Sequence, residues 1–113
     1  MIEATVRNYL LSRLSYPVYI DVPPEPVTPY VVLERTGGGE REHIRNATIA
    51  IQSYGASKYE AASLHESVME EMKSLITLDD ISACELNAEY DYTDTETKRY
   101  RYQAVYNIIY YGG

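Results

Sequence analysis

The sequence predicts an α+β fold, in which two helices pack on one face of a mostly antiparallel sheet. Apolar side chains recur at helical spacing in two stretches, 2–14 and 57–76. Runs typical of strands lie between these stretches and after the second one. The expected order is helix, three strands, helix, two strands, with no internal repeat. At 113 residues, the chain 1–113 is expected to form a single domain.

The first helix is expected over residues 2–14 and ends before Pro17. Its apolar face consists of five side chains: Ile2, Val6, Tyr9, Leu10 and Leu14. Residues 18–22 are predicted to form a short strand. Four of the five prolines follow in 23–29. Because proline lacks an N–H and biases its predecessor to extended geometry, this segment is expected to be a stiff connector at a sheet edge or outside the sheet.

The connection between the next two predicted strands, 30–36 and 44–54, is the most distinctive stretch of the chain. A plain hairpin connection needs only about two to five residues. Here a longer, charged and mobile arm is expected at the end of a long β-hairpin, with its three consecutive glycines acting as hinges. Eight residues are therefore candidate interface residues: Arg35, Thr36, Gly37, Gly38, Gly39, Glu40, Arg41 and Glu42.

The second helix begins with a capping box formed by Ser57 and Glu60. In this motif the serine oxygen accepts an N–H of the first turn, and the glutamate reaches back to a free N–H before the helix. The helix is expected to run to about Ile76. Its apolar stripe has the spacing of one helix face: Ala61, Leu64, Val68, Met72 and Leu75.

Residues 83–111 are expected to form a long C-terminal β-hairpin, because apolar and polar side chains alternate in both halves. The expected register pairs Asp91 with Arg99 and Glu89 with Arg101, which places opposite charges across from each other on the solvent face. The same register sets further pairs on the other face: Tyr90 with Tyr100 and Ala88 with Tyr102.

The end of the last strand, 108–111, is apolar on both faces. Two explanations remain open. Either the strand is central and covered on both sides by its own chain, or another subunit covers one side. On the second explanation, Ile109 and Tyr111 are candidate interface residues.

Composition excludes several classes of function. The net charge of −7 argues against binding nucleic acid by counterion release, although it allows DNA to pass without being held. No run approaches the roughly 18 apolar residues of a membrane span. Thirteen tyrosines, with no Phe or Trp, suit half-buried sheet faces and interfaces, or reflect compositional drift in a β-rich chain.

The reactive side chains do not form a recognisable active, metal or cofactor site. His43 lies beside the arm and is expected to be solvated, whereas His65 is expected to be structural. The single Cys84 cannot form an internal disulfide and is expected to pack as a small apolar residue. The glycine run lacks the Gly-Lys-Ser/Thr ending of a phosphate loop. We expect no enzyme activity and no cofactor. Since the first residues lack signal-peptide features, synthesis and folding in the cytoplasm are expected.

Four features follow one another along nearly the whole chain. They are a leading helix before Pro17–Tyr19, a proline-rich connector, Pro29–Gly39 with its RTGGG ending, and Ile49–Gly55 before an alanine-rich helix. In this layout the chain resembles the small tail terminator, or head–tail joining, proteins of long-tailed phages and prophages. The most distinctive part of the resemblance is the RTGGG segment.

The resemblance implies a non-enzymatic virion assembly protein, located in the tail or neck and made in the host bacterial cytoplasm. Proteins of this kind form a homo-oligomeric ring, commonly six-fold, on the head-proximal end of the tail tube. The ring ends tube polymerisation and joins the tail to the head connector. DNA passes through it without sequence-specific binding, and no membrane is involved. Among individual residues, the resemblance assigns an interface role only to the position of the arm.

Two other functions remain in competition at this stage. A neighbouring role in the same particle, as another neck, head-completion or tail-tube-like subunit, is barely distinguished by sequence. Gene position between connector and tube genes would separate these roles. A small-ligand-binding α+β domain is the alternative from another class, because tyrosine-rich sheet faces could line a pocket.

Overall fold

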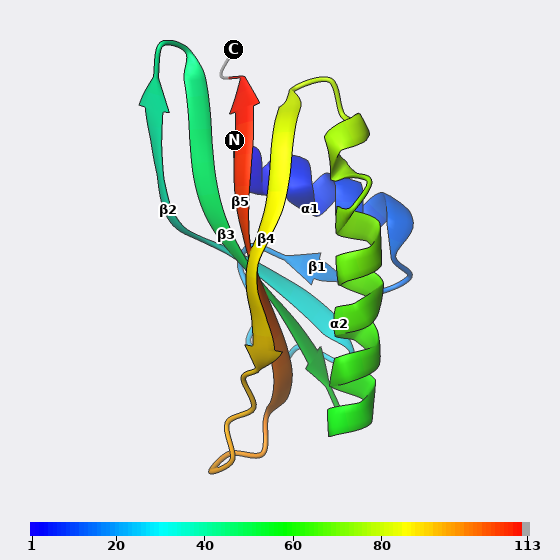
Figure 1. Cartoon of the computed structure of the whole chain (residues 1–113). Helices are drawn as coiled ribbons and strands as arrows, with labels where there is room; N and C mark the ends of the chain where they lie inside the picture. Colours follow the sequence, from blue (N-terminus) through cyan, green and yellow to red (C-terminus); the bar gives the residue numbers. More distant parts are fainter. Residues whose placement is uncertain (112–113) are drawn as a thin grey trace.

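A computed structural model describes residues 1–111 of the chain as a five-stranded sheet with helices on one face (Figure 1). The α+β prediction is confirmed. The strand order is β1-β2-β3-β5-β4. The elements follow in sequence order: α1 Ile2–Arg13, β1 Val18–Tyr19, β2 Tyr30–Arg41, β3 Ile44–Gly55, α2 Lys58–Met72, the 3₁₀ turn η1 Leu75–Thr77, β4 Ile81–Asp91 and β5 Tyr100–Tyr111.

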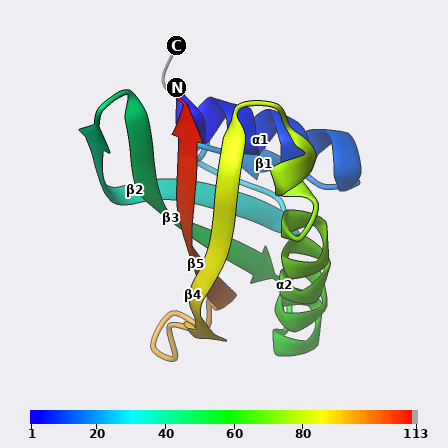
Figure 2. The ribbon, with the colours of Figure 1, turned by 45° about the horizontal axis from the view of Figure 1, so that its top comes forward.

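The sheet is mixed through a single parallel pair at one edge. The predicted strand 18–22 is reduced to the two residues of β1, which run parallel to β2 at Val31 and Val32. All other neighbours are antiparallel. The proline-rich segment contains no strand, as expected, and its Thr28–Pro29 peptide is cis. The sheet twists strongly along its length, as the two views show (Figures 1 and 2).

Helix α1 packs beside β1 and β2 and against α2, and its first residues lie near Ile81 and Tyr110. Its Val6 and Leu10 are fully buried, which follows from the predicted apolar face. The Tyr9 hydroxyl donates a 2.7 Å hydrogen bond to the carbonyl oxygen of Glu71 near the end of α2. A helix end leaves such carbonyls without partners inside the helix. Tyr9 therefore stabilises the contact between the two helices.

Helix α2 begins as its capping box predicts. The Glu60 N–H donates to the Ser57 hydroxyl oxygen at 3.1 Å, and the Glu60 carboxylate accepts from the N–H of Ala56 at 2.8 Å. The expected end near residue 76 is partly correct, because the α-helix stops at Met72 and the 3₁₀ turn continues the chain. The buried stripe matches the prediction with one addition, His65.

The close approach of α2 to β3 depends on Gly55. A Cβ built there would lie 2.9 Å from the Ala61 Cα and the Glu60 carbonyl carbon, both backbone atoms of the first turn of α2. Real Cβ atoms essentially never show contacts that short. Ala61 is itself fully buried. The small residues Gly55 and Ala61 thus allow the helix to lie directly against the strand.

The C-terminal hairpin is confirmed, but its predicted register is wrong. Glu89 pairs with Ala104 and Asp91 with Tyr102, three positions away from the expected Arg101 and Arg99. The aromatic and small pairs of the expected register are displaced in the same way, with Tyr90 opposite Gln103 and Ala88 opposite Val105.

A bulge in β4 between Leu86 and Ala88 accounts for one of the three positions and for the change of face. One extra residue reverses the direction of every side chain that follows it. Glu89 and Asp91 therefore point towards α2, where His65 and Lys58 lie 3.0 Å away from their carboxylates. Side chains of the helix thus take the place of the cross-strand arginines.

Candidate functional site

The arm is a regular extension of the hairpin, which corrects the prediction of a long loop with hinge glycines. Strand β2 runs to Arg41, and Gly37, Gly38 and Gly39 are paired with Thr48, Ala47 and Asn46 of β3. The connection is a turn of two residues, Glu42 and His43, with φ of 51° and 70°. Two positive φ values suit the twist of a tight hairpin. The predicted hairpin arm is present, but its residues are paired as strands instead of forming a loop.

A bulge at Thr36 marks the base of the arm, because pairing shifts between Arg35 and Gly37. The Arg35 side chain folds back along the strand, and its Nε donates to the carbonyl oxygen of Gly37 at 3.1 Å. Gly38 lies beneath this guanidinium with φ of +156°. A Cβ at Gly38 would collide with the arginine and would lie 2.5 Å from the backbone oxygen of Asn46.

Gly38 and Gly39 are therefore expected to respond differently to replacement by alanine. Gly38→Ala should lower the free energy of unfolding by about 1–2 kcal/mol, because the backbone of β3 cannot move aside as a side chain can. Gly39→Ala is the matched control, since its Cβ would meet only side-chain atoms of Asn46 at 3.8 Å or more. Urea unfolding and amide exchange of the arm measure the difference. Equal stability of the two variants would contradict this assignment.

The face of the sheet opposite the helices carries the two remaining predicted interface residues. Strand β5 lies between β3 and β4, and Ile108 and Tyr110 are buried against the helical side. Ile109 is half-buried and Tyr111 is 56% exposed on the other side. Around Ile109 and Tyr111, no helix or strand among residues 1–111 covers this face, whereas further along it the proline-rich segment lies beside Tyr30 and Tyr54. The explanation that its own chain covers β5 on both sides is therefore wrong.

Further along the same face, the hydroxyl groups of Tyr54 and Tyr90 take part in a chain of hydrogen bonds. Arg101 donates to the Tyr54 hydroxyl at 3.0 Å, and that hydroxyl donates to Gln52 at 3.2 Å. Gln52 donates to Gln103 at 2.8 Å, and Gln103 donates to the Tyr90 hydroxyl. These hydrogen bonds link β3, β4 and β5. In both glutamines the side-chain amide oxygen accepts a hydrogen bond and the amide nitrogen donates one. A polar network satisfied in this way rigidifies this half of the face.

On the opposite side of the sheet, polar side-chain contacts connect α2 with β4. His65 is buried, and its Nε2 lies 3.0 Å from the Glu89 carboxylate, a partner that its sequence neighbourhood did not reveal. Hydrogen bonds from Thr93 and then Lys58 lower the pKa of Asp91 to about 2. Because this pKa is depressed, the Asp91 contribution to stability is present above about pH 4 and is lost as the pH falls towards 2.

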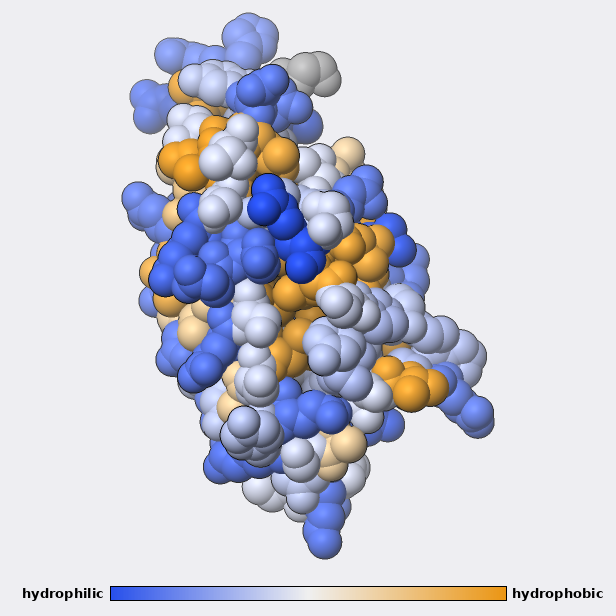
Figure 3. Space-filling view, turned by 90° about the vertical axis from the view of Figure 1, so that its right-hand side faces the viewer, coloured by the Kyte–Doolittle hydropathy of each residue, from blue (hydrophilic) through white to orange (hydrophobic). Residues whose placement is uncertain are grey.

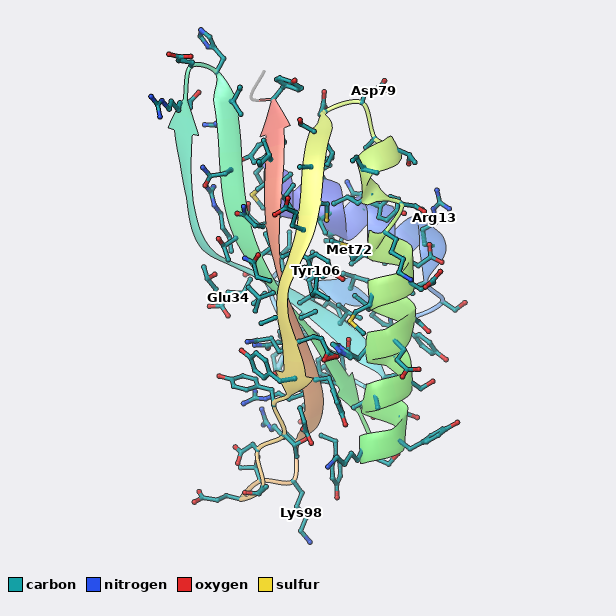
Figure 4. The ribbon with its side chains drawn as sticks, in the orientation of Figure 1. Arg13, Glu34, Met72, Asp79, Lys98 and Tyr106 are labelled. Atoms are coloured by element: carbon teal, nitrogen blue, oxygen red, sulfur yellow. The ribbon has the colours of Figure 1, made fainter. Side chains whose placement is uncertain are left out.

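A groove of about 520 Å³ lies between α2 and β4. Its floor is mainly apolar and includes Met72 of α2 and Tyr106 of β5, which both point into the space between helix and sheet (Figure 4). Burial raises the pKa of Tyr106 to about 12. The rim carries Glu66, Glu70 and Lys73. Seen from the α2 side, apolar patches lie among charged and polar surface (Figure 3).

Cys84 lines the same groove as a protonated thiol. Burial raises its pKa to about 11, so the nucleophilic thiolate is scarce at neutral pH. We expect iodoacetamide to alkylate Cys84 in the folded chain at least about tenfold more slowly at about pH 8 than in the urea-unfolded chain. Mass spectrometry of timed samples measures both rates. Equal rates would show that the thiol is freely ionised in the fold.

Within residues 1–111, no group of three His, Cys, Asp or Glu side chains is placed to hold a metal ion. His43, as expected, is exposed at the turn of the arm. Over the same residues, no helix is long and apolar enough to cross a membrane. The surfaces that stand out are therefore the arm, the uncovered face around Ile109 and Tyr111, and the groove beside β4.

In comparisons with known proteins, the sequence matches no family model and no curated protein.

Proposed function

We propose that this chain is a non-enzymatic virion assembly protein that caps the head-proximal end of a phage tail tube. It forms a homo-oligomeric ring, with six copies as the expected number, ends tube polymerisation and joins the tail to the head connector. Its partners are its own copies, the tail tube protein and a connector or neck protein. The site of action is the tail or neck of the virion.

The main support for this proposal is that the two lateral edges of the sheet are formed by different strands, each without a neighbouring strand among residues 1–111 over much of its length. The free side of β2 in the arm lies at one lateral edge, and β4 lies at the other (Figure 1). A ring needs two different complementary patches on each subunit, because every copy meets its two neighbours through different sides. The uncovered face around Ile109 and Tyr111 offers a further apolar surface for tube or connector.

The charge of the chain supports the same proposal. A net charge of −7 on each copy suits a channel through which DNA slides without being held, since a basic lumen would bind phosphates. A basic lumen in the assembled ring would contradict this part of the proposal.

Light scattering and electron microscopy of the purified chain, alone and with phage tail tubes, test the proposal. We expect a ring, or a monomer that forms rings once tubes are supplied. A chain that stays monomeric and binds neither tail tube nor connector protein would refute it. Binding to a connector alone would favour the neighbouring role of a neck or head-completion subunit.

The groove between α2 and β4 favours a second candidate, a small-ligand-binding domain. Its volume of about 520 Å³ lies within the range of ligand pockets, about 300–1,000 Å³. Its floor offers few polar groups to orient a ligand, which makes this candidate weaker. A thermal-shift screen with small apolar acids and amines tests it, with Leu86→Trp as the variant that should fill the groove and abolish any shift.

A further inference from the structure

Each lateral edge of the sheet leaves a length of strand without a neighbour. On the outer side of β2, the short β1 pairs only with Val31 and Val32. The rest of β2, up to Arg41, has no outer neighbour among residues 1–111. On the other side, β4 is the last strand along its whole length, from Ile81 to Asp91.

Parts of these edges lack the features by which monomeric proteins protect an open strand. Natural edges are usually short, or carry lysine, proline, bulges or a covering segment. Strand β4 is 11 residues long and contains neither lysine nor proline, and the arm contains neither as well. Bulges interrupt both strands, but each keeps a regular stretch, Gly37–Arg41 in β2 and Ala83–Leu86 in β4.

The two regular stretches lie at the same level of the sheet. The pairing can be followed from β2 through β3 and β5 to β4 along three ladders: Gly37–Thr48–Asn107–Glu85, Gly38–Ala47–Ile108–Cys84 and Gly39–Asn46–Ile109–Ala83. A second copy displaced sideways within the sheet would therefore bring its arm beside the first half of β4.

The direction of the strands also fits. Three successive antiparallel pairs separate β2 from β4, so these two strands run in opposite directions. A neighbour related by sideways displacement thus presents β2 antiparallel to β4, the commoner and slightly more stable arrangement. The helices of both copies stay on the same side of the joined sheet, as a ring with one inner and one outer face requires.

The residues at this junction lie on matching faces, and three of the four on the uncovered face are glycine or alanine. Gly39 and Ala83 share the uncovered face, as do Gly37 and Glu85, because each pair occupies one ladder. The glycines present no side chain that could hold the strands apart. Pairing β4 with β4 of another copy is less favourable, since it joins two strands whose only charges are carboxylates: Glu85, Glu89 and Asp91.

We propose that the arm segment Gly37–Gly39 of one copy adds as an antiparallel strand to Ala83–Glu85 of the next, joining their sheets into a continuous one. The proposal rests on the ring assembly proposed above and names the contact that builds it. Gly37 then lies opposite Glu85, and Gly39 lies opposite Ala83. Main-chain hydrogen bonds supply the contact, as in other cases of strand addition.

Disulfide trapping with single-cysteine chains tests this register. Each chain carries Cys84→Ser and one of four changes: Gly37→Cys, Gly39→Cys, Ala83→Cys or Glu85→Cys. Both glycine positions have room, since a Cβ at either would lie 3.8 Å or more from its neighbours. Directly opposed residues have Cα atoms about 4.5–5.5 Å apart, within the range of about 4.4–6.8 Å that a disulfide spans.

Equimolar mixtures are oxidised under conditions in which light scattering reports an oligomer, with tail tubes supplied where they are needed. We expect cross-linked dimers from Gly37→Cys with Glu85→Cys and from Gly39→Cys with Ala83→Cys. The crossed mixtures, Gly37→Cys with Ala83→Cys and Gly39→Cys with Glu85→Cys, are the matched controls. Their diagonal separation of about 7–8 Å is too long, so they should give little product.

The outcomes separate this inference from the proposed function. An oligomer whose matched mixtures do not cross-link overturns the strand pairing and leaves the ring proposal standing. Cross-linking of single variants alone identifies a two-fold contact of like edges and also overturns the pairing. Matched cross-links in a particle that binds neither tail tube nor connector support the pairing and refute the proposed function. A chain that is monomeric under every condition refutes both.

Discussion

Replacing Gly55 by alanine is expected to lower the free energy of unfolding by about 3 kcal/mol. The added methyl group has no space, because it would lie 2.9 Å from backbone atoms of Glu60 and Ala61. To make room for the methyl group, the start of α2 would have to move away from β3, and this movement would loosen the packing along the helix. For a domain of this size, whose total stability is about 5–15 kcal/mol, this is a large loss.

Chemical denaturation in urea measures the Gly55 effect, and Gly39→Ala is again the matched control. Gly39 has ordinary contacts only, so alanine there should change stability by about 0.5 kcal/mol or stabilise slightly through the unfolded state. Equal effects at Gly55 and Gly39 would show that α2 can shift away from the sheet at little cost. Thermal melting followed by circular dichroism gives an independent measure of the same difference.

The parts of the fold that could be predicted from sequence depend on interactions between residues close together in the chain. The start of α2 is of this kind, because Ser57 and Glu60 satisfy neighbouring N–H groups by themselves. The alternation in β5 is also local, and it placed Ile108 and Ile109 on opposite faces. It could not decide what covers the second face, since that depends on the whole arrangement of strands and helices.

The arm was misjudged because glycine is usually a poor strand residue. Pairing with β3 and the arginine that folds back over Gly38 overcome that weak preference. The two-residue turn at Glu42 and His43 was equally hidden, since neither residue belongs to the Asn-Gly or Asp-Gly pairs that usually mark such turns. The eight candidate residues form paired strand and the start of the turn instead of the expected loop, and their role as an interface stays a prediction.

The register of the C-terminal hairpin was missed for a different reason. Complementary charges in the two strands suggested cross-strand pairs, yet Glu89 and Asp91 are satisfied by residues of α2. Those partners, His65 and Lys58, are more than twenty residues away in the chain. The bulge near residue 87 that turns the carboxylates towards them has no strong local signature, because nothing special is required of the residues that form it.

The neighbouring residues Ile108 and Ile109 should respond very differently to the same substitution. Ile108 is fully buried under the helices, so Ile108→Ala should cost about 2–5 kcal/mol in unfolding free energy. Ile109 is half-buried on the uncovered face, and Ile109→Ala should cost only about 1 kcal/mol. Urea unfolding of both variants measures the contrast. Comparable losses would mean that both sides of β5 are covered in the isolated chain.

The same position separates stability from assembly. Ile109→Lys should fold, because the long lysine side chain can extend its charge into solvent from a half-buried site. It should lose most of its association with further copies or with tail tubes, since covering the face would bury that charge without a partner. Light scattering and co-sedimentation with tubes measure the loss, and Asn107→Lys, two residues along the same face and already polar, is the control. If Ile109→Lys assembles as well as the unchanged chain, the uncovered face is ordinary solvent-exposed surface, and the contacts of the proposed ring must lie at the strand edges alone.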